Sequence, residues 1–309
     1  TTRNESSAAS DVYKRQAPLK KLQGRGYASG FWFNAGGESS AQVNITEDGN
    51  VVVTTGHPDI GGSRASIANI TAELLGIDIN RVSVLIGDTA TIGFSNLTGG
   101  SRVLFASALV VTESTNQVID ILKDRASKIW NIDKEAIEWE NGEARPAGDN
   151  AGKFKPLSLV ELAEQATPTG GPIGAGHQVN TVGAEGGFAT HICDVEVDIE
   201  LGIARVIRYT AAQDVGKAIH PAYVEGQLQG GVVQGIGWAL NEEYIYNKEG
   251  KLDNPGFLDY RIPVCSDLPM IDTILVEVPN PQHPQGVRGV GEVPVSYTHL
   301  TLPTTHCVE

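Results

Sequence analysis

Two stretches of the sequence share one order of patterns, and this repetition restricts the folds available to the chain. In the first, alternating residues 41–45 lead through an Asp-Gly turn to the β-branched run 51–54, which is the pattern of a β-hairpin. A glycine loop over 56–63 follows, and residues 66–75 then show a helical pattern that is closed by Gly76.

The second stretch repeats this order. Residues 193–199 alternate between apolar and acidic side chains, the chain turns near Gly202, and it returns through 206–209. An Asp-Val-Gly loop at 214–216 then precedes a helical pattern over about 221–240. The repetition predicts an α+β fold with two hairpin–loop–helix units, although an ordinary α+β layout that binds no ligand has the same pattern.

Charge and cysteine content exclude several classes of partner. The formal net charge is −14 and there is no run of Lys or Arg, so we expect no nucleic-acid partner. No apolar segment is long enough to cross a bilayer, so no membrane span is predicted. The three cysteines are far apart and form no Cys-x-x-Cys pair, which argues against an iron–sulfur cluster or structural zinc in this chain and favours a cytoplasmic protein.

The two ends of the chain read as foreign sequence. Residues 11–16 and 295–300 are translations of opposite strands of one DNA sequence, which looks like the transposase recognition end used to prepare sequencing libraries. We therefore expect residues 1–16 and 295–309 to be sequencing-adapter scars and exclude them from the functional argument.

Three loops combine closely spaced glycines with Ser or Gln, whose exposed amides and directional hydrogen bonds suit an anionic or amide-rich ligand. No Lys-Ser or Lys-Thr follows a glycine loop, so the pattern is not that of a nucleotide P-loop. Gln227 and Gln234 are seven residues apart and share one helix face, while close helix packing is the alternative explanation of the glycines around them. The candidate ligand-binding residues are Gly61, Gly62, Gly99, Gly100, Ser101, Arg102, Gln227, Gln234 and Gly291.

Charged residues beside these loops have more than one interpretation. Arg102 either steadies an anionic ligand or cofactor oxygen, or it pairs with a surface acid. Asp59, Asp88 and Asp214 all lie at turns, where turn and capping hydrogen bonds explain an aspartate without any chemistry.

The candidate catalytic residue is Glu292, in the sequence Gly289-Val290-Gly291-Glu292-Val293. Gly289 and Gly291 free the backbone for a tight turn and close approach to a bulky group. Apolar neighbours disfavour a charged carboxylate, so the pKa of Glu292 is expected to rise toward a value useful for a base near neutrality.

The ordered set of motifs between Gly24 and Pro294 resembles the C-terminal half of the molybdopterin-binding large subunit of the xanthine dehydrogenase/aldehyde oxidase family. The motifs that carry the resemblance are Gly87-Asp88-Thr89, Gly99-Gly100-Ser101-Arg102, Gln213-Asp214-Val215-Gly216, Gln234-Gly235-Ile236-Gly237 and Gly286 to Glu292. The resemblance implies that residues 17–294 form the second molybdopterin-binding lobe, with two subdomains joined near residues 146–176.

The resemblance also implies an activity, that of a molybdenum hydroxylase acting on an N-heteroaromatic compound or an aldehyde. In such enzymes a glutamate takes a proton from a hydroxyl on molybdenum, the oxygen attacks carbon, and hydride passes to a sulfido ligand. Glu292 matches this base, and Gly99 to Ser101 match the loop against the metal's ligands. Gln227 and Gln234 match the helix that contacts the pterin, and no protein side chain ligates the metal.

The implied cofactor is molybdopterin, with its cytosine dinucleotide form left open. Partner subunits are expected to carry 2Fe-2S clusters and FAD, and the N-terminal molybdopterin lobe is missing from this sequence. Gly62 departs from the family pattern, because many members have glutamine there. Two accounts of the chain remain: a truncated catalytic subunit, or a natural split chain similar to the medium subunit of nicotinate dehydrogenase. A non-catalytic cofactor-holding or assembly chain, which completes a partner's site, is the alternative function.

Overall fold

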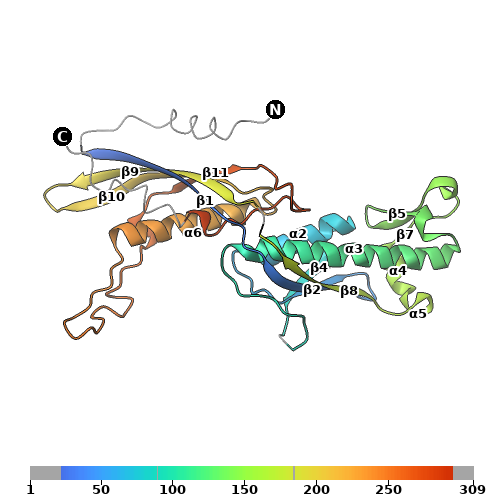
Figure 1. The fold of residues 1–309 in the computed structure, drawn as a ribbon. Coiled ribbons are helices and arrows are strands. Elements are labelled where there is room, and N and C mark those ends of the chain that lie inside the picture. Colours follow the sequence, from blue (N-terminus) through green and yellow to red (C-terminus); the bar gives the residue numbers. More distant parts are fainter. Residues whose placement is uncertain (1–21, 89, 184, 295–309) are drawn as a thin grey trace. The chain divides into compact units, whose positions relative to one another are not determined.

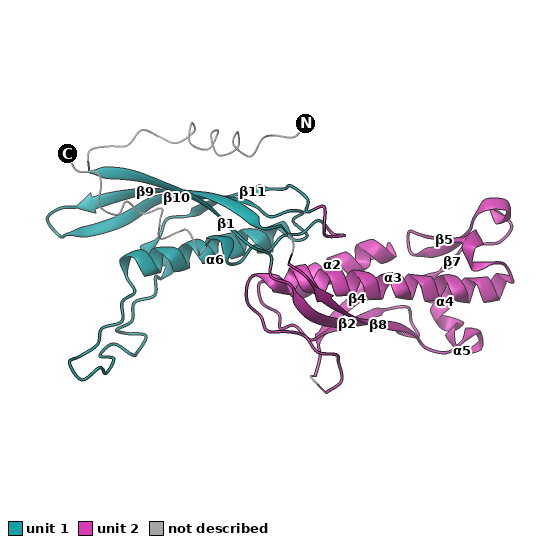
Figure 2. Cartoon of the chain, viewed as in Figure 1, with its two compact units in different colours: residues 1–34, 185–280, 286–309 teal, residues 35–184, 281–285 magenta. Residues whose placement is uncertain are grey.

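The structure is a computed structural model of the 309-residue chain, and it describes residues 22–88, 90–183 and 185–294. Residues 1–16 and 295–309, the expected adapter scars, lie outside the described residues. The chain forms two compact units, which are coloured separately in Figure 2. Of the described residues, unit 1 combines 22–34, 185–280 and 286–294, and unit 2 combines 35–88, 90–183 and 281–285.

Unit 2 contains a four-stranded sheet with two helices packed on it (Figure 1). Its strand order is β4-β3-β2-β8, in which β2 pairs antiparallel with β3 and β8 while β3 and β4 are parallel. The elements are β2 (Gly37–Ile45), β3 (Val51–Thr55), α2 (Ser63–Leu75), β4 (Val82–Ile86), α3 (Arg102–Trp130) and β8 (Ile173–Thr181). Their apolar faces meet in one core, whose members include Val43, Val53, Ile67, Val111 and Leu122.

Unit 2 also contains a small three-stranded sheet and two short helices: β5 (Ile137–Glu140), β6 (Glu143–Pro146), β7 (Leu157–Ser158), α4 (Leu159–Glu164) and α5 (Ala166–Thr169). Single helical turns lie at η1 (Ile79–Arg81), η2 (Lys134–Ala136) and η3 (Gly148–Asn150). Segment 146–176, where the sequence predicts a junction, lies within unit 2. Leu159 and Leu162 of α4 are buried in the same core as α3, so this stretch is held by unit 2, and the units divide after Asn34 and Ala184 instead.

Unit 1 contains a second four-stranded sheet, in the order β1-β9-β10-β11 (Figure 1). Its elements are β1 (Gln23–Trp32), β9 (Gly187–Asp198), β10 (Ile203–Asp214), α6 (Pro221–Leu240), η4 (Cys265–Asp267) and β11 (Ile271–Val276). β9 pairs antiparallel with β1 and β10, and β10 is parallel to β11. Val232 and Ile236 of α6 pack on Cys193, Val195 and Tyr209 of the sheet.

The predicted α+β fold with two hairpin–loop–helix units is confirmed. β2-β3-α2 and β9-β10-α6 are the two units of the repeated pattern, and each helix leads into a strand parallel to the second hairpin strand. Each sheet is extended by one antiparallel edge strand, β8 or β1. In the described part of the chain, no helix combines the length and the apolar character needed to cross a lipid bilayer.

Candidate functional site

Both glycine loops of unit 2 lead directly into the first turn of a helix. Gly62 is the N-cap of α2 with φ 75°, and Ser101 is the N-cap of α3 with φ 58°. Gly61 and Gly100 precede them in the same left-handed region, each with φ 68°. In α2 the first-turn Arg64 N donates to Asp59 Oδ1 at 3.0 Å, which caps that helix. Ser101 accepts no capping hydrogen bond at the start of α3, so the first turn of α3 offers N–H donors suited to an anionic ligand.

The sheet of unit 2 brings these two loops to one edge. β3 and β4 are parallel, so their carboxyl ends lie at the same edge, and a glycine loop follows each of them. The loops touch at Gly56, where an added Cβ would lie 2.6 Å from Ser95 Oγ. The sequence candidates 61–62 and 99–101 therefore belong to one region of unit 2.

Arg102 holds this region together from inside. Its side chain is buried, and every one of its five guanidinium N–H donors has a protein acceptor. The acceptors are Gly36 O (2.7 Å), Asn96 O (3.1 Å), Leu97 O (3.1 Å), Glu38 O (2.8 Å) and Ser39 Oγ (2.9 Å). Arg102 therefore does not pair with a surface acid, and it has no N–H donor left for a ligand oxygen. Its hydrogen bonds connect the loop before α3 to the start of β2.

His57 joins the same network from the loop after β3. Its Nε2 lies 2.9 Å from Ser39 Oγ, the hydroxyl that also accepts from Arg102. Burial, with the Arg102 guanidinium nearby, lowers the pKa of His57 to about 4, so the ring is neutral at physiological pH. A neutral imidazole beside a buried guanidinium avoids like-charge repulsion.

In unit 1, α6 presents Gln227 and Gln234 beside bare helix backbone. Gln227 is half-buried and Gln234 is exposed. A Cβ added at Gly226 or Gly230 would meet no atom within 4 Å, whereas one at Gly237 would lie 2.7 Å from Pro263 Cδ. Close packing explains Gly237, but it does not explain Gly226 and Gly230, which leave a flat surface next to two side-chain amides.

The turn that carries Glu292 is bonded to the loop after β10. Lys217 N donates to Gly286 O at 2.8 Å, and Arg288 N donates to Val215 O at 3.2 Å. Gly216 is required here, because its φ is 67° and a Cβ on it would lie 2.3 Å from Gly286 O. The close approach of these two segments is the reason for the glycine in the Asp-Val-Gly motif.

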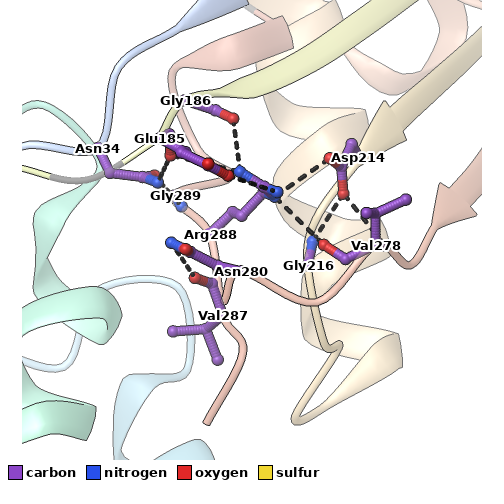
Figure 3. A network of polar contacts seen from close by, with 10 residues as sticks. All are labelled: Asn34, Glu185, Gly186, Asp214, Gly216, Val278, Asn280, Val287, Arg288 and Gly289. Atoms are coloured by element: carbon purple, nitrogen blue, oxygen red, sulfur yellow. Dashed lines mark hydrogen bonds and ion pairs between the residues drawn. The ribbon is translucent and has the colours of Figure 1, made fainter. Parts of the chain in front are cut away.

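Figure 3 shows a polar network around Arg288, a residue of the motif from Gly286 to Glu292 for which the sequence alone indicates no role. Arg288 Nε lies 3.1 Å from Asp214 Oδ2, and both side chains are buried. The expected turn function of Asp214 is confirmed, since its Oδ1 accepts from Gly216 N at 3.0 Å. The sequence signal for this role is that Arg288 and Glu292 are the two charged residues in an otherwise glycine- and valine-rich stretch, 286–293.

Glu292 begins the last described turn of the chain, between Gly291 and the fully buried Val293, and its side chain is half-buried. Just before it, Gln213 of β10 donates from Nε2 to Val290 O at 3.2 Å. The candidate residues therefore fall into two groups. Unit 1 holds Glu292, Gly291, Gln227 and Gln234, and unit 2 holds Gly61, Gly62, Gly99, Gly100, Ser101 and Arg102.

A sequence profile described as the molybdopterin cofactor-binding domain matches residues 4–269. The chain belongs to this family. It is 26% identical over 288 residues to the carbon monoxide dehydrogenase large chain of Hydrogenophaga pseudoflava, covering 86% of this chain and 36% of that protein. It is 28% identical over 305 residues to the putative xanthine dehydrogenase molybdenum-binding subunit XdhA of Escherichia coli strain K12. This match covers 91% of this chain and 39% of that protein.

Among solved structures, quinoline 2-oxidoreductase from Pseudomonas putida 86 superimposes with a TM-score of 0.80 at 26% identity, over 96% of this chain and 40% of that chain. The resemblance to the xanthine dehydrogenase/aldehyde oxidase family is thereby confirmed. This molybdopterin-binding domain spans between a third and two fifths of the length of the relatives named here.

Groups on each unit, taken separately, suit parts of a molybdopterin. A pterin is planar and has an amide-like edge, which suits the bare α6 surface at Gly226 and Gly230 with Gln227 and Gln234 beside it. Its phosphate suits a helix N-terminus such as the one that follows Ser101.

Proposed function

We propose that this domain is the C-terminal half of the catalytic subunit of a molybdenum hydroxylase, which hydroxylates an N-heteroaromatic compound or an aldehyde with oxygen from water. The observation that carries the proposal is the position of Glu292, a half-buried carboxylate on a turn bonded to the loop after β10 and to Gln213. A carboxylate held in this way is suited to act as a base.

The proposed roles follow from the chemistry of each group. When bound, the cofactor supplies the two-electron oxidation and the activation of the attacking oxygen. Glu292 accepts the proton of that oxygen, and Gly291 keeps its backbone compact. Gln227 and Gln234 bond the pterin edge, while the backbone at Gly61, Gly62, Gly99, Gly100 and Ser101 binds anionic groups. Arg102 acts on the cofactor indirectly, by holding the loop before α3 in place.

An N-heteroaromatic substrate is the preferred proposal within the two classes. XdhA is named for xanthine and the superimposed structure for quinoline, and both compounds are nitrogen heterocycles. The carbon beside a ring nitrogen is electron-poor, which is the requirement for attack by an oxygen nucleophile.

We also propose partners, because the domain spans only part of its relatives' length. The remainder of the molybdenum subunit supplies the other cofactor lobe, and subunits with 2Fe-2S clusters and FAD remove the electrons. The cytosine dinucleotide form is the proposed variant of the cofactor. Cys193 and Cys265 are free thiols, which supports a cytoplasmic location.

The test is Glu292→Gln in the full-length subunit within its complex. We expect turnover to fall at least about 100-fold, because a general base is removed, while molybdenum and pterin content stay unchanged. Glu249→Gln, at an exposed glutamate of the same unit, is the matched control and should leave turnover unaltered. If Glu292→Gln is fully active, the cofactor-holding role without catalysis replaces this proposal.

A further inference from the structure

We propose that Arg288, through its buried ion pair with Asp214 and with Asn34 as a second anchor, is a positioning residue that holds the turn from which Glu292 acts. This inference rests on the proposed role of Glu292 as the base. It concerns a different question, namely what fixes the base in space, and it can fail while that role stands.

The ion pair is buried on both sides. The side chains of Arg288 and Asp214 are 6% and 4% exposed, and Nε and Oδ2 are 3.1 Å apart. Removing two charges from water is unfavourable unless further bonds satisfy them, so such pairs are weak devices for stability alone. The pair between Arg208 and Asp272 in the same sheet is an instructive contrast, since its side chains are 40% and 56% exposed.

The guanidinium of Arg288 links three segments of unit 1 (Figure 3). Its Nη1 donates to Gly186 O at 2.9 Å, at the start of β9. Its Nε lies near Asp214 at the end of β10 and 3.3 Å from Val278 O, just after β11. The ends of all three neighbouring strands therefore converge on one side chain, which itself belongs to the closing turn.

Asp214 reinforces the same junction. Its Oδ1 accepts from Gly216 N at 3.0 Å and from Val278 N at 3.4 Å. One carboxylate thus orders the loop after β10, the chain after β11 and the Arg288 side chain. Replacing Asp214 releases bonds at all of these positions, whereas replacing Arg288 releases the bonds of its guanidinium to Asp214, Val278 and Gly186.

The residue after Arg288 has an anchor of its own. Gly289 N donates to Asn34 Oδ1 at 2.6 Å, and Asn34 Nδ2 donates to Glu185 O, which Arg288 Nη1 also approaches at 3.4 Å. Val290 O is then held by Gln213. Three consecutive residues, 288 to 290, are bonded to the strand ends, and Glu292 follows two residues later.

A positioning role for Arg288 predicts a different effect from a role in stability alone. A base works when its oxygen lies within hydrogen-bond reach of the proton, and a displacement of about 1 Å costs roughly 100-fold in rate. A loosened turn moves Glu292 without removing it. The chemical step then slows, whereas binding groups elsewhere in the site are untouched.

The experiment uses Arg288→Lys in the full-length subunit within its complex, because lysine keeps the charge but loses the planar set of donors. We expect kcat to fall by about 10- to 100-fold, with KM changed less than about threefold and molybdenum and pterin content retained. Hydrogen exchange of the peptide 286–292 should become faster. Arg208→Lys, at the exposed ion pair, is the control and should change neither.

Combination with Glu292→Gln separates the hypotheses. If Arg288 acts through Glu292, the double variant is no slower than Glu292→Gln alone. Losses that multiply, or a normal kcat in Arg288→Lys while Glu292→Gln is inactive, overturn the positioning role and leave the proposed function intact. An active Glu292→Gln overturns the proposed function itself.

Asn34 provides a second route if Arg288→Lys does not fold. Asn34→Ala removes both the acceptor of Gly289 N and the donor to Glu185 O. We expect Asn34→Ala to lower kcat about 10-fold or more, on the same grounds of displacement, with molybdenum and pterin content retained. Equal kcat values for wild type and Asn34→Ala contradict the inference.

Discussion

The helix that follows the hairpin in unit 2, α2, buries seven of its 13 residues, whereas the corresponding helix of unit 1, α6, buries six of its 20. Both connect a hairpin to a strand parallel to its second strand. In unit 2 a further long helix, α3, adds apolar residues to the same core as α2. In unit 1 the glycines at 226 and 230 have open space above them. One chain plan thus gives a largely buried helix in unit 2 and, in unit 1, a helix that packs on its sheet and leaves the surface at Gly226 and Gly230 open.

The two units also anchor their loops with different chemistry. Unit 2 uses Arg102 with carbonyl acceptors and the neutral ring of His57. Unit 1 uses the charged pair of Arg288 and Asp214. In unit 2, Arg102 connects the backbone before α3 to the start of β2. In unit 1, Arg288 and Asp214 connect the strand ends to the turn that leads to Glu292.

The largest expected effect on stability comes from matched cavities in the two helices. Ile67 of α2 and Ile236 of α6 are each 1% exposed. We expect Ile67→Ala to lower the free energy of unfolding by about 4 kcal/mol and Ile236→Ala by about 2 kcal/mol, both within the usual range, because the core cluster around α2 is larger than the one around α6. Hydrogen exchange of peptides from each helix measures both losses. Equal losses would show that the two cores are packed alike.

A smaller effect per residue is the loss of folding stability at acid pH, and each unit contains a buried histidine that contributes to it. His57 in unit 2 and His191 in unit 1 are buried beside a hydroxyl, and burial lowers the pKa of each from 6.5 to about 4. The unfolded state therefore binds more protons between these values, and stability falls as pH falls from 6.5 to 4, by roughly 3 kcal/mol for each ring.

Replacement of the rings tests this pH dependence. Urea unfolding between pH 4 and 7 should show a shallower slope for His57→Gln and for His191→Gln than for wild type. Hydrogen exchange should place each change in the unit that contains the residue. A variant whose slope matches that of wild type contradicts the assigned protonation.

The smallest predicted change in stability comes from Gly230→Ala in α6, which should affect cofactor binding and folding in opposite directions. Gly230→Ala should stabilise the domain by about 0.5–1 kcal/mol, because alanine is the better helix former and the position is open. Pterin content of the full-length subunit should nevertheless fall, since a methyl group then stands on the proposed cofactor surface. Ala239→Ser, at an exposed position of the same helix, is the matched control and should leave the pterin content unchanged. Stabilisation with full pterin content argues against the cofactor surface.

The hairpins and crossover helices could be predicted because their signals are local. Alternation over residues 41–45 and 193–199, turns with glycine, and the helical pattern after each loop all lie within a few tens of residues. The edge strands β1 and β8 carry no such signal of where they pair. β1 pairs with β9 more than 150 residues later, as in Gln23 with Glu196, and no periodicity reports that distance.

The candidate residues also differ in whether local sequence or distant contacts define their roles. The glycine loops were found from composition, and the structure gives Gly62 and Ser101 as helix N-caps. Arg102 was singled out, but its five protein acceptors are spread over residues 36–39 and 96–97. Asp214 was interpreted as a turn residue, which is confirmed, while its partner lies 74 positions away at Arg288.

The sequence by itself determined the α+β class, the two repeated units and the types of residue available for binding and proton transfer, since period and turn chemistry act between near neighbours. Only the tertiary structure decided which strand closes each sheet, where the chain divides into units, and which side chains hold the turn of Glu292. These depend on contacts between distant segments, where burial makes each unsatisfied polar group costly and so selects one set of partners.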